Sequence, residues 1–148
     1  MEYSGEIPVK STMESVKTFL SSIENITPCL PGIYDFETQG NEIKCKLKLD
    51  ISAAGISAMN SVTGKMTFAY NPEENGLNIQ GTGRIAGSKV KFSIEISYAD
   101  KNEIVTLEWK SSFDFGLIVK IMGKNKVDEI SKQNINRTIK CISDKLNA

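Results

Sequence analysis

Residues 43–51 read Ile-Lys-Cys-Lys-Leu-Lys-Leu-Asp-Ile, a regular alternation of apolar and charged side chains. Successive side chains of a β-strand point to opposite faces, so this stretch predicts a strand with one buried and one solvated face. The same period of two recurs, with turn residues between the runs, in 33–38, 62–70, 77–85, 90–98 and 105–115. Short turns between such runs favour antiparallel pairing, so the sequence predicts a meander of about six strands.

The segments on either side of the meander predict one more strand and two helical regions. Residues 2–9 alternate loosely and predict a seventh strand. Ser11 to Glu14 has the capping-box pattern, and apolar residues at helical spacing follow, so a helix is expected over about 12–24. Pro28 and Pro31 allow at most one further short helical turn. The final ~30 residues return to helical periodicity and predict a long C-terminal helix.

This order of elements predicts an α+β fold of one domain over residues 1–148. A curved antiparallel sheet of six to seven strands would wrap around the C-terminal helix, because its apolar face has to be covered. A single helix rarely fills the whole concavity of so wide a sheet. A cavity between sheet and helix is therefore expected, and apolar cavities bind apolar ligands.

Composition excludes several classes of function. The chain has 18 basic and 18 acidic residues, which argues against a nucleic-acid binder. Residues 1–115 carry 11 basic and 15 acidic side chains, whereas residues 116–148 carry 7 basic and 3 acidic ones, so the C-terminal segment is net positive. No apolar run approaches the ~20 residues that a membrane-spanning helix needs.

Histidine and cysteine usage narrows the chemistry further. The chain has no histidine, which removes Ser-His-Asp and Cys-His triads and the usual zinc sites. Cys29, Cys45 and Cys141 are far apart and odd in number, so neither a metal spacing nor a disulfide framework is expected. Three free thiols and the absence of a signal-peptide pattern predict a cytoplasmic protein. No metal and no cofactor are expected.

Several short motifs resemble those of one family. Cys29-Leu30-Pro31-Gly32 looks like its Cys-aliphatic-Pro-Gly signature, and Gly55-Ile56 is similar to its Gly-Pro-Ile segment without the proline. Gly81-Thr82-Gly83 and the run from Gly116 to Gly123 also fit. On these motifs the chain resembles the family of the G subunit of carbon monoxide dehydrogenase, within the START and birch-pollen-allergen-like (SRPBCC) superfamily. That superfamily has the helix-grip fold, and the resemblance covers nearly the whole chain.

The resemblance implies a small accessory protein that is not an enzyme. Such a protein would hold a lipid-like or quinone-like molecule and help to recruit a molybdenum hydroxylase of the carbon monoxide dehydrogenase type to the inner face of the membrane. Some family members carry an apolar C-terminal anchor, and this sequence ends at Ala148 without one, so only peripheral membrane contact is expected. Two other functions stay open: a polyketide cyclase or aromatase, from the same superfamily, and a stress-type activator of a partner protein.

The expected ligand-binding residues are apolar or small residues on the inward registers, with two polar ones among them. They are Leu30, Leu49, Ile56, Met66, Phe68, Ile79, Gly81, Gly83, Phe92, Ile94, Trp109, Ser111, Phe113, Ile130 and Asn134. Gly81 and Gly83 could either clear space for a ligand or only permit the sheet to bend. Ser111 and Asn134 could meet a ligand, a water molecule or a neighbouring side chain, because buried polar groups need partners.

A basic cluster lies at the expected start of the last helix. Lys120, Lys124 and Lys126 stand beside Leu117, Ile118, Ile121 and Met122. The cluster could be an ordinary solvated face. Alternatively, it could dock an acidic partner or anionic lipid headgroups, which a positive segment with apolar neighbours would favour.

Overall fold

The computed structural model describes residues 1–52 and 61–147. Within them, one seven-stranded antiparallel sheet has the strand order β1-β7-β6-β5-β4-β3-β2. The strands are β1 (Glu2–Val9), β2 (Ile33–Gln39), β3 (Glu42–Asp50), β4 (Ser61–Glu73), β5 (Gly76–Ile85), β6 (Ser88–Lys101) and β7 (Ile104–Asp114). The predicted α+β fold, meander and N-terminal strand are confirmed. The N-terminal strand adds to the far side of β7 and not to β2.

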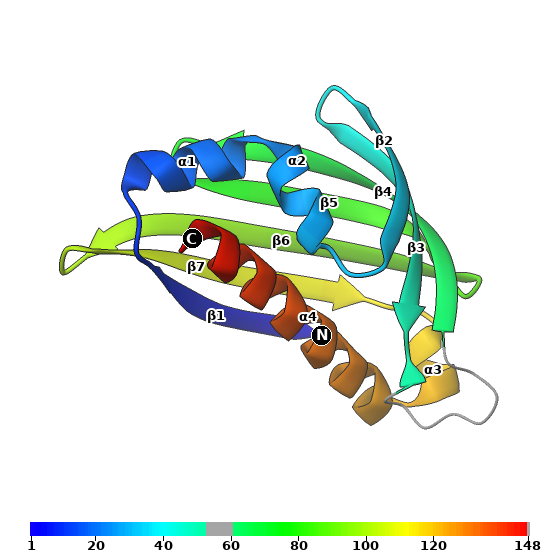
Figure 1. Ribbon diagram of the computed structural model, residues 1–148. Helices are drawn as coiled ribbons and strands as arrows, with labels where there is room; N and C mark the ends of the chain where they lie inside the picture. Colours follow the sequence, from blue (N-terminus) through cyan, green and yellow to red (C-terminus); the bar gives the residue numbers. More distant parts are fainter. Residues whose placement is uncertain (53–60, 148) are drawn as a thin grey trace.

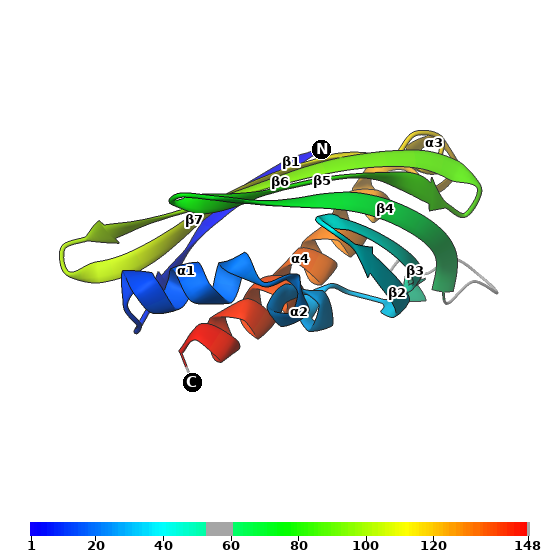
Figure 2. The same cartoon turned by 90° about the horizontal axis from the view of Figure 1, so that it is seen from above.

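The alternation of side chains sets which face of the sheet is buried. In β3 the side chains of Ile43, Cys45 and Leu47 are buried, while those of Lys44 and Lys46 are exposed. The inward residues of the other strands join them in one core. The two helices between β1 and β2 and most of the long C-terminal helix lie on the same side of β4, β5 and β6 (Figure 2). The sheet therefore has an inner, apolar face and an outer, polar face.

The first helical region is shorter and more broken than the sequence predicts. Helix α1 (Met13–Ser21) is followed by the short helix α2 (Ile23–Ile26) and the 3₁₀ turn η1 (Thr27–Cys29). The N-cap is Thr12 and not Ser11: its hydroxyl accepts from the backbone N–H of Ser15 at 3.1 Å. Ser22 adopts an extended conformation and interrupts the helix there. The single short turn expected at the prolines is η1, with Pro28 near its start.

The C-terminal helical region is two helices, α3 (Ile118–Met122) and α4 (Lys124–Leu146). Gly123 separates them with φ of 88°, a left-handed conformation that glycine adopts without steric cost. Helix α4 runs diagonally across the inner face of the sheet (Figure 1). Val127, Ile130 and Ile142 are among its buried residues, so its apolar stripe faces the sheet.

A side-chain hydrogen bond ties the edge strand β1 to α4. The Tyr3 hydroxyl donates to the Asp128 carboxylate, with 2.8 Å between Oη and Oδ1. This bond is the main reason that the pKa of Asp128 lies below its usual range, and Lys132 lowers it further. Burial, followed by the hydrogen bond to Asp128, raises the pKa of Tyr3 to about 12.

The Tyr3→Phe variant should have a higher pKa at Asp128 and lower stability at pH 7. A carboxyl whose folded-state pKa is depressed adds stability above its unfolded pKa of about 3.9, and this stability is lost as the pH falls through the folded value. The stability difference between wild type and variant should therefore shrink below about pH 4. Urea unfolding across pH and NMR titration of Asp128 measure both effects. Tyr34→Phe is the control, since Tyr34 is 63 % exposed. Equal Asp128 titration in all three proteins would contradict the expectation.

Candidate ligand site on the inner face

A row of aromatic rings crosses the inner face from one strand to the next. The register places Phe68 of β4 opposite Gly81 of β5, Gly81 opposite Phe92 of β6, and Phe92 opposite Phe113 of β7. Ring centroids are 6.2 Å apart for Phe68 and Phe92 and 6.1 Å apart for Phe92 and Phe113. These separations lie within the range of favourable aromatic contacts, so the row is a continuous apolar surface.

The two inward glycines make room for neighbouring protein atoms. A Cβ on Gly81 would overlap the ring of Phe92, which leans over it. A Cβ on Gly83 would overlap the backbone carbonyl of Lys65 and the sulfur of Met66. Leucine at either position should therefore destabilise the fold directly, so these substitutions cannot test ligand binding.

Helix α4 does not cover the whole inner face. Several apolar side chains on the inward registers keep some exposure, among them Phe92, Ile94, Trp109 and Phe113, whereas Met66, Phe68 and Ile79 are buried. These four belong to β6 and β7, beside the end of the sheet where β1 pairs, and Leu49 of β3 and Val62 of β4 are also partly exposed. An inward-facing apolar surface that remains accessible is what a hydrophobic ligand requires.

Two buried polar atoms on this surface have no hydrogen-bond partner within the described residues. They are Oγ of Ser111, whose residue is 7 % exposed, and Nε1 of Trp109. An unpaired buried polar group costs free energy comparable to a lost hydrogen bond. The polar groups of α4 differ: Ser131 Oγ donates to the carbonyl of Val127 at 2.7 Å, and Asn134 Nδ2 donates to that of Ile130 at 3.0 Å.

The expected ligand residues fall into two neighbourhoods, and one lies outside the described residues. Leu30, Leu49 and Asn134 meet around a hollow of about 360 Å³ between η1, the end of β3 and α4. Lys48, Asp50 and Arg137 also line this hollow, so it has a polar rim. The remaining inward residues lie on the sheet or, for Ile130, on the facing side of α4. The residue outside the described ranges is Ile56.

A disulfide between Cys29 and Cys141 borders the same hollow. It joins η1 to α4 across 112 residues of sequence, with 5.4 Å between the Cα atoms. The expectation of three free thiols was wrong: only Cys45, which is buried, is free. The two partners cannot be matched from sequence spacing because the fold alone brings them together. Since disulfides persist mainly in oxidising surroundings, the argument from free thiols to a reducing compartment also fails.

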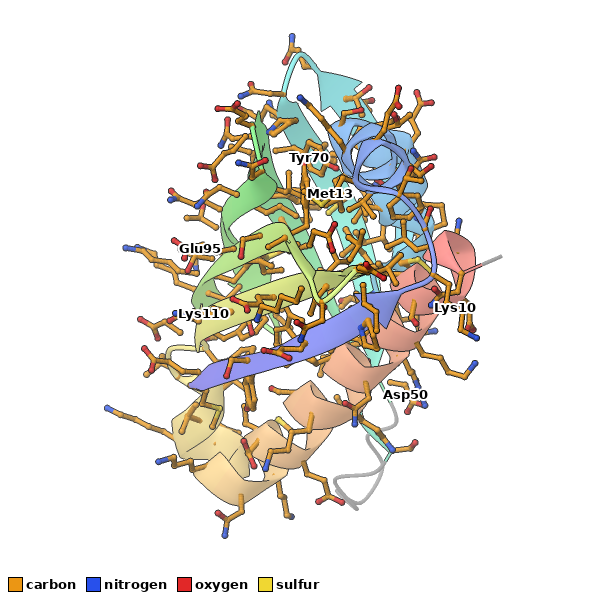
Figure 3. All side chains as sticks on the ribbon, turned by 90° about the vertical axis from the view of Figure 1, so that its left-hand side faces the viewer. Lys10, Met13, Asp50, Tyr70, Glu95 and Lys110 are labelled. Atoms are coloured by element: carbon orange, nitrogen blue, oxygen red, sulfur yellow. A yellow bond between two sulfur atoms is a disulfide. The ribbon has the colours of Figure 1, made fainter. Side chains whose placement is uncertain are left out.

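The side chains that could carry acid–base chemistry are engaged elsewhere. The hydroxyl of Tyr70 donates to the carbonyl of Leu20 on α1, and that of Tyr98 donates to the carbonyl of Glu74 at 2.9 Å. Burial raises the pKa of both phenols, so they stay protonated at neutral pH. Glu95 and Lys110 lie on the outer face, away from α4, whereas Tyr70 lies between the sheet and α1 (Figure 3).

The basic cluster is exposed, but fewer of its apolar neighbours are exposed than the sequence predicts. Lys120, Lys124 and Lys126 are all exposed. Leu117 is 59 % and Ile121 is 79 % exposed, whereas Ile118 is buried and cannot offer apolar contact. Cations in the first turn of a helix oppose its dipole, and α4 has no acidic residue there to compensate.

The sheet and the long helix across its inner face make a helix-grip, START-like fold. A structure of a conserved protein from Geobacillus kaustophilus is similar, with a TM-score of 0.81 at 19 % identity over 99 % of this chain and 95 % of that one. So is the Zhui aromatase/cyclase from Streptomyces sp. R1128, with a TM-score of 0.67 at 11 % identity over 99 % and 93 % of the two chains. A START superfamily protein from Mycobacterium smegmatis has a TM-score of 0.63 at 12 % identity over 98 % and 96 %.

Residues 5–147 match the family model for the G subunit of carbon monoxide dehydrogenase (CoxG), and the chain belongs to that family. The resemblance inferred from the short motifs is thereby confirmed. No curated protein matches the sequence. Among the described residues, no helix is both long and apolar enough to cross a membrane.

Removing the disulfide should destabilise the fold by about 2–5 kcal/mol, because the bridge closes a long loop in the unfolded chain. Cys141→Ser and the Cys29→Ser/Cys141→Ser pair should show equal losses in denaturant unfolding, as should wild type under reducing conditions. Thiol titration of denatured, unreduced wild type should detect one thiol, from Cys45. Detection of three thiols in oxidised protein, or unchanged stability on reduction, would contradict the expectation.

Proposed function

We propose that the inner face beneath α4 binds an apolar small molecule that carries a carbonyl or hydroxyl group, such as a quinone or a lipid. The observation that carries this proposal is that Ser111 Oγ, within a partly exposed aromatic surface, has no hydrogen-bond partner in residues 1–52 and 61–147. A ligand oxygen there would satisfy the buried hydroxyl, while Phe92, Phe113 and Trp109 would contact its apolar body.

We further propose that the protein is a non-catalytic accessory protein. Membership of the CoxG family supports association with a carbon monoxide dehydrogenase-type molybdenum hydroxylase and its recruitment to a membrane surface. The absence of histidine from the sequence and the backbone-bound hydroxyls of Tyr70 and Tyr98 support binding without turnover. The alternative is a cyclase, which the fold likeness to the Zhui aromatase/cyclase favours. Turnover of a poly-β-ketone that is lost in Tyr70→Phe would support the alternative.

Ligand binding can be followed through Trp109, the single tryptophan of the chain. Decylubiquinone should quench its fluorescence, since the quinone would lie against the indole. Ser111→Ala should weaken quinone binding by about five- to tenfold, which is the value of one hydrogen bond, and should not lower stability because the hydroxyl has no partner to lose. Native mass spectrometry of protein purified from its own host tests for a copurifying ligand.

Ser112→Ala is the matched control, because Ser112 is the next residue and is exposed on the outer face. It should bind decylubiquinone as the wild type does. Two results together would refute the ligand proposal: no quenching at any concentration, and no small molecule in the native mass spectrum. Equal affinities of all three proteins would exclude Ser111 as the polar contact.

We propose that the basic cluster contacts an anionic membrane surface, with Ile121 inserted beside it. Lys124→Glu/Lys126→Glu should weaken co-sedimentation with phosphatidylglycerol vesicles, most strongly at low salt, because exposed charges are screened beyond ~8–10 Å at ~0.1–0.15 M salt. The same change should stabilise α4 by about 0.3–1 kcal/mol per residue through the helix dipole. A loss of binding would then not reflect unfolding.

Lys17→Glu/Lys145→Glu is the control of equal charge, since both lysines are exposed and lie on other surfaces. This control should bind vesicles as the wild type does. Ile121→Ser should weaken vesicle binding by an amount that does not depend on the salt concentration. If the cluster variant sediments as the wild type does at every ionic strength, the cluster is a solvated face.

A further inference from the structure

A row of four cations crosses the outer face of the sheet. Lys46 of β3 is paired with Lys65 of β4, Lys65 with Arg84 of β5, and Arg84 with Lys89 of β6. All four side chains are exposed on the outer face. Neighbouring strands lie about 4.7–4.9 Å apart, so the row is roughly 14 Å long. Like charges directly opposite each other destabilise a sheet, which makes this arrangement unfavourable for folding alone.

The row lines a shallow hollow of about 600 Å³. Lys91 adds a fifth cation, and no carboxylate is among the described residues that line the hollow. Gly87 also lines the hollow, and a Cβ on it would meet no atom within 4 Å, so this side of the hollow is open. Within the described part of the chain, the only ion pair of these cations is that of Lys46 with Asp35, at 3.7 Å. Most of the positive charge is therefore available to a partner.

We propose that this basic row is the docking site for an acidic α-helix of a partner protein. Carboxylates at positions i, i+4, i+7 and i+11 of a helix have neighbouring Cβ atoms about 5–6 Å apart and span roughly 16 Å. Both values match the spacing and the length of the row. The proposal does not depend on the inner-face ligand or on the cluster at the start of α4.

The shape and chemistry of the row favour a helix over other anions. Phosphate sites commonly use arginine forks or free backbone N–H groups. The row has one arginine, and its backbone N–H groups lie within paired strands. Its charges are also spread along a line, whereas a single phosphate would require them to converge. A lipid surface is flat, whereas this site is hollowed. Of the described residues that line it, Tyr34 alone is a large apolar side chain that is exposed.

A labelled alanine-rich peptide with glutamates at i, i+4, i+7 and i+11 tests the proposal by fluorescence anisotropy at low salt. A second peptide has the same composition, with the glutamates distributed around the helix. The striped peptide should bind at least about fivefold more tightly. Lys65→Glu/Arg84→Glu should weaken its binding at least about tenfold, whereas the Lys17→Glu/Lys145→Glu control should change it less than about twofold.

Lys65→Gln/Arg84→Gln provides a second variant that removes repulsion across the strands, so its melting temperature should equal or exceed that of the wild type. It should also lose preference for the striped peptide. Equal binding of both peptides, or undiminished binding by both row variants, would overturn the proposal. Two further probes are inorganic tripolyphosphate and phosphatidylglycerol vesicles. The proposal is wrong if the row variants weaken the binding of either probe while the striped peptide does not bind. The site would then belong to a small anion or to lipid.

Discussion

The burial of one face of a seven-stranded sheet under one long helix is the constraint on which the other features depend. Helix α4 is 23 residues long and crosses the inner face diagonally (Figure 1). It can bury only the strip of sheet that it contacts. Helices α1 and α2 and the turn η1 cover a further part of the same face (Figure 2). The inward surface of β6 and β7, where Trp109 and Phe113 lie, stays partly exposed. The candidate ligand site is therefore a consequence of incomplete coverage.

The position of α4 is held at several points along its length. Near its start, Asp128 accepts the hydrogen bond from Tyr3 of the edge strand. Towards its end, Cys141 is bonded to Cys29 of η1. Beyond the helix, Asn147 Oδ1 accepts from the backbone N–H of Lys10 at 2.6 Å. These links join α4 to the edge strand β1, to Lys10 and to η1. The hollow at Leu30, Leu49 and Asn134 is lined by both cysteines of the disulfide.

The two faces of the sheet are suited to different partners. The inner face presents aromatic rings and two polar atoms that have no partner among the described residues, which suit a largely apolar molecule. The outer face presents lysines and one arginine in register, which suit an acidic surface. One fold can host unrelated activities, and a START superfamily protein and a cyclase share this one, so function has to be inferred from these surfaces.

Local sequence patterns predict most of the strands and helices, and short motifs indicate the family. Contacts between distant segments decide the remaining features of the structure. The period of two identified the meander and the inward aromatic residues, but their remaining exposure depends on where α4 lies. The breaks at Ser22 and Gly123 were missed, since the apolar periodicity continues across each. The Cys29–Cys141 bridge closes across 112 residues, and no spacing rule identifies such a pair. The cation row takes one residue from each of four strands, so it exists only in one pairing register. A local pattern reports the environment of one segment, whereas register is set between segments.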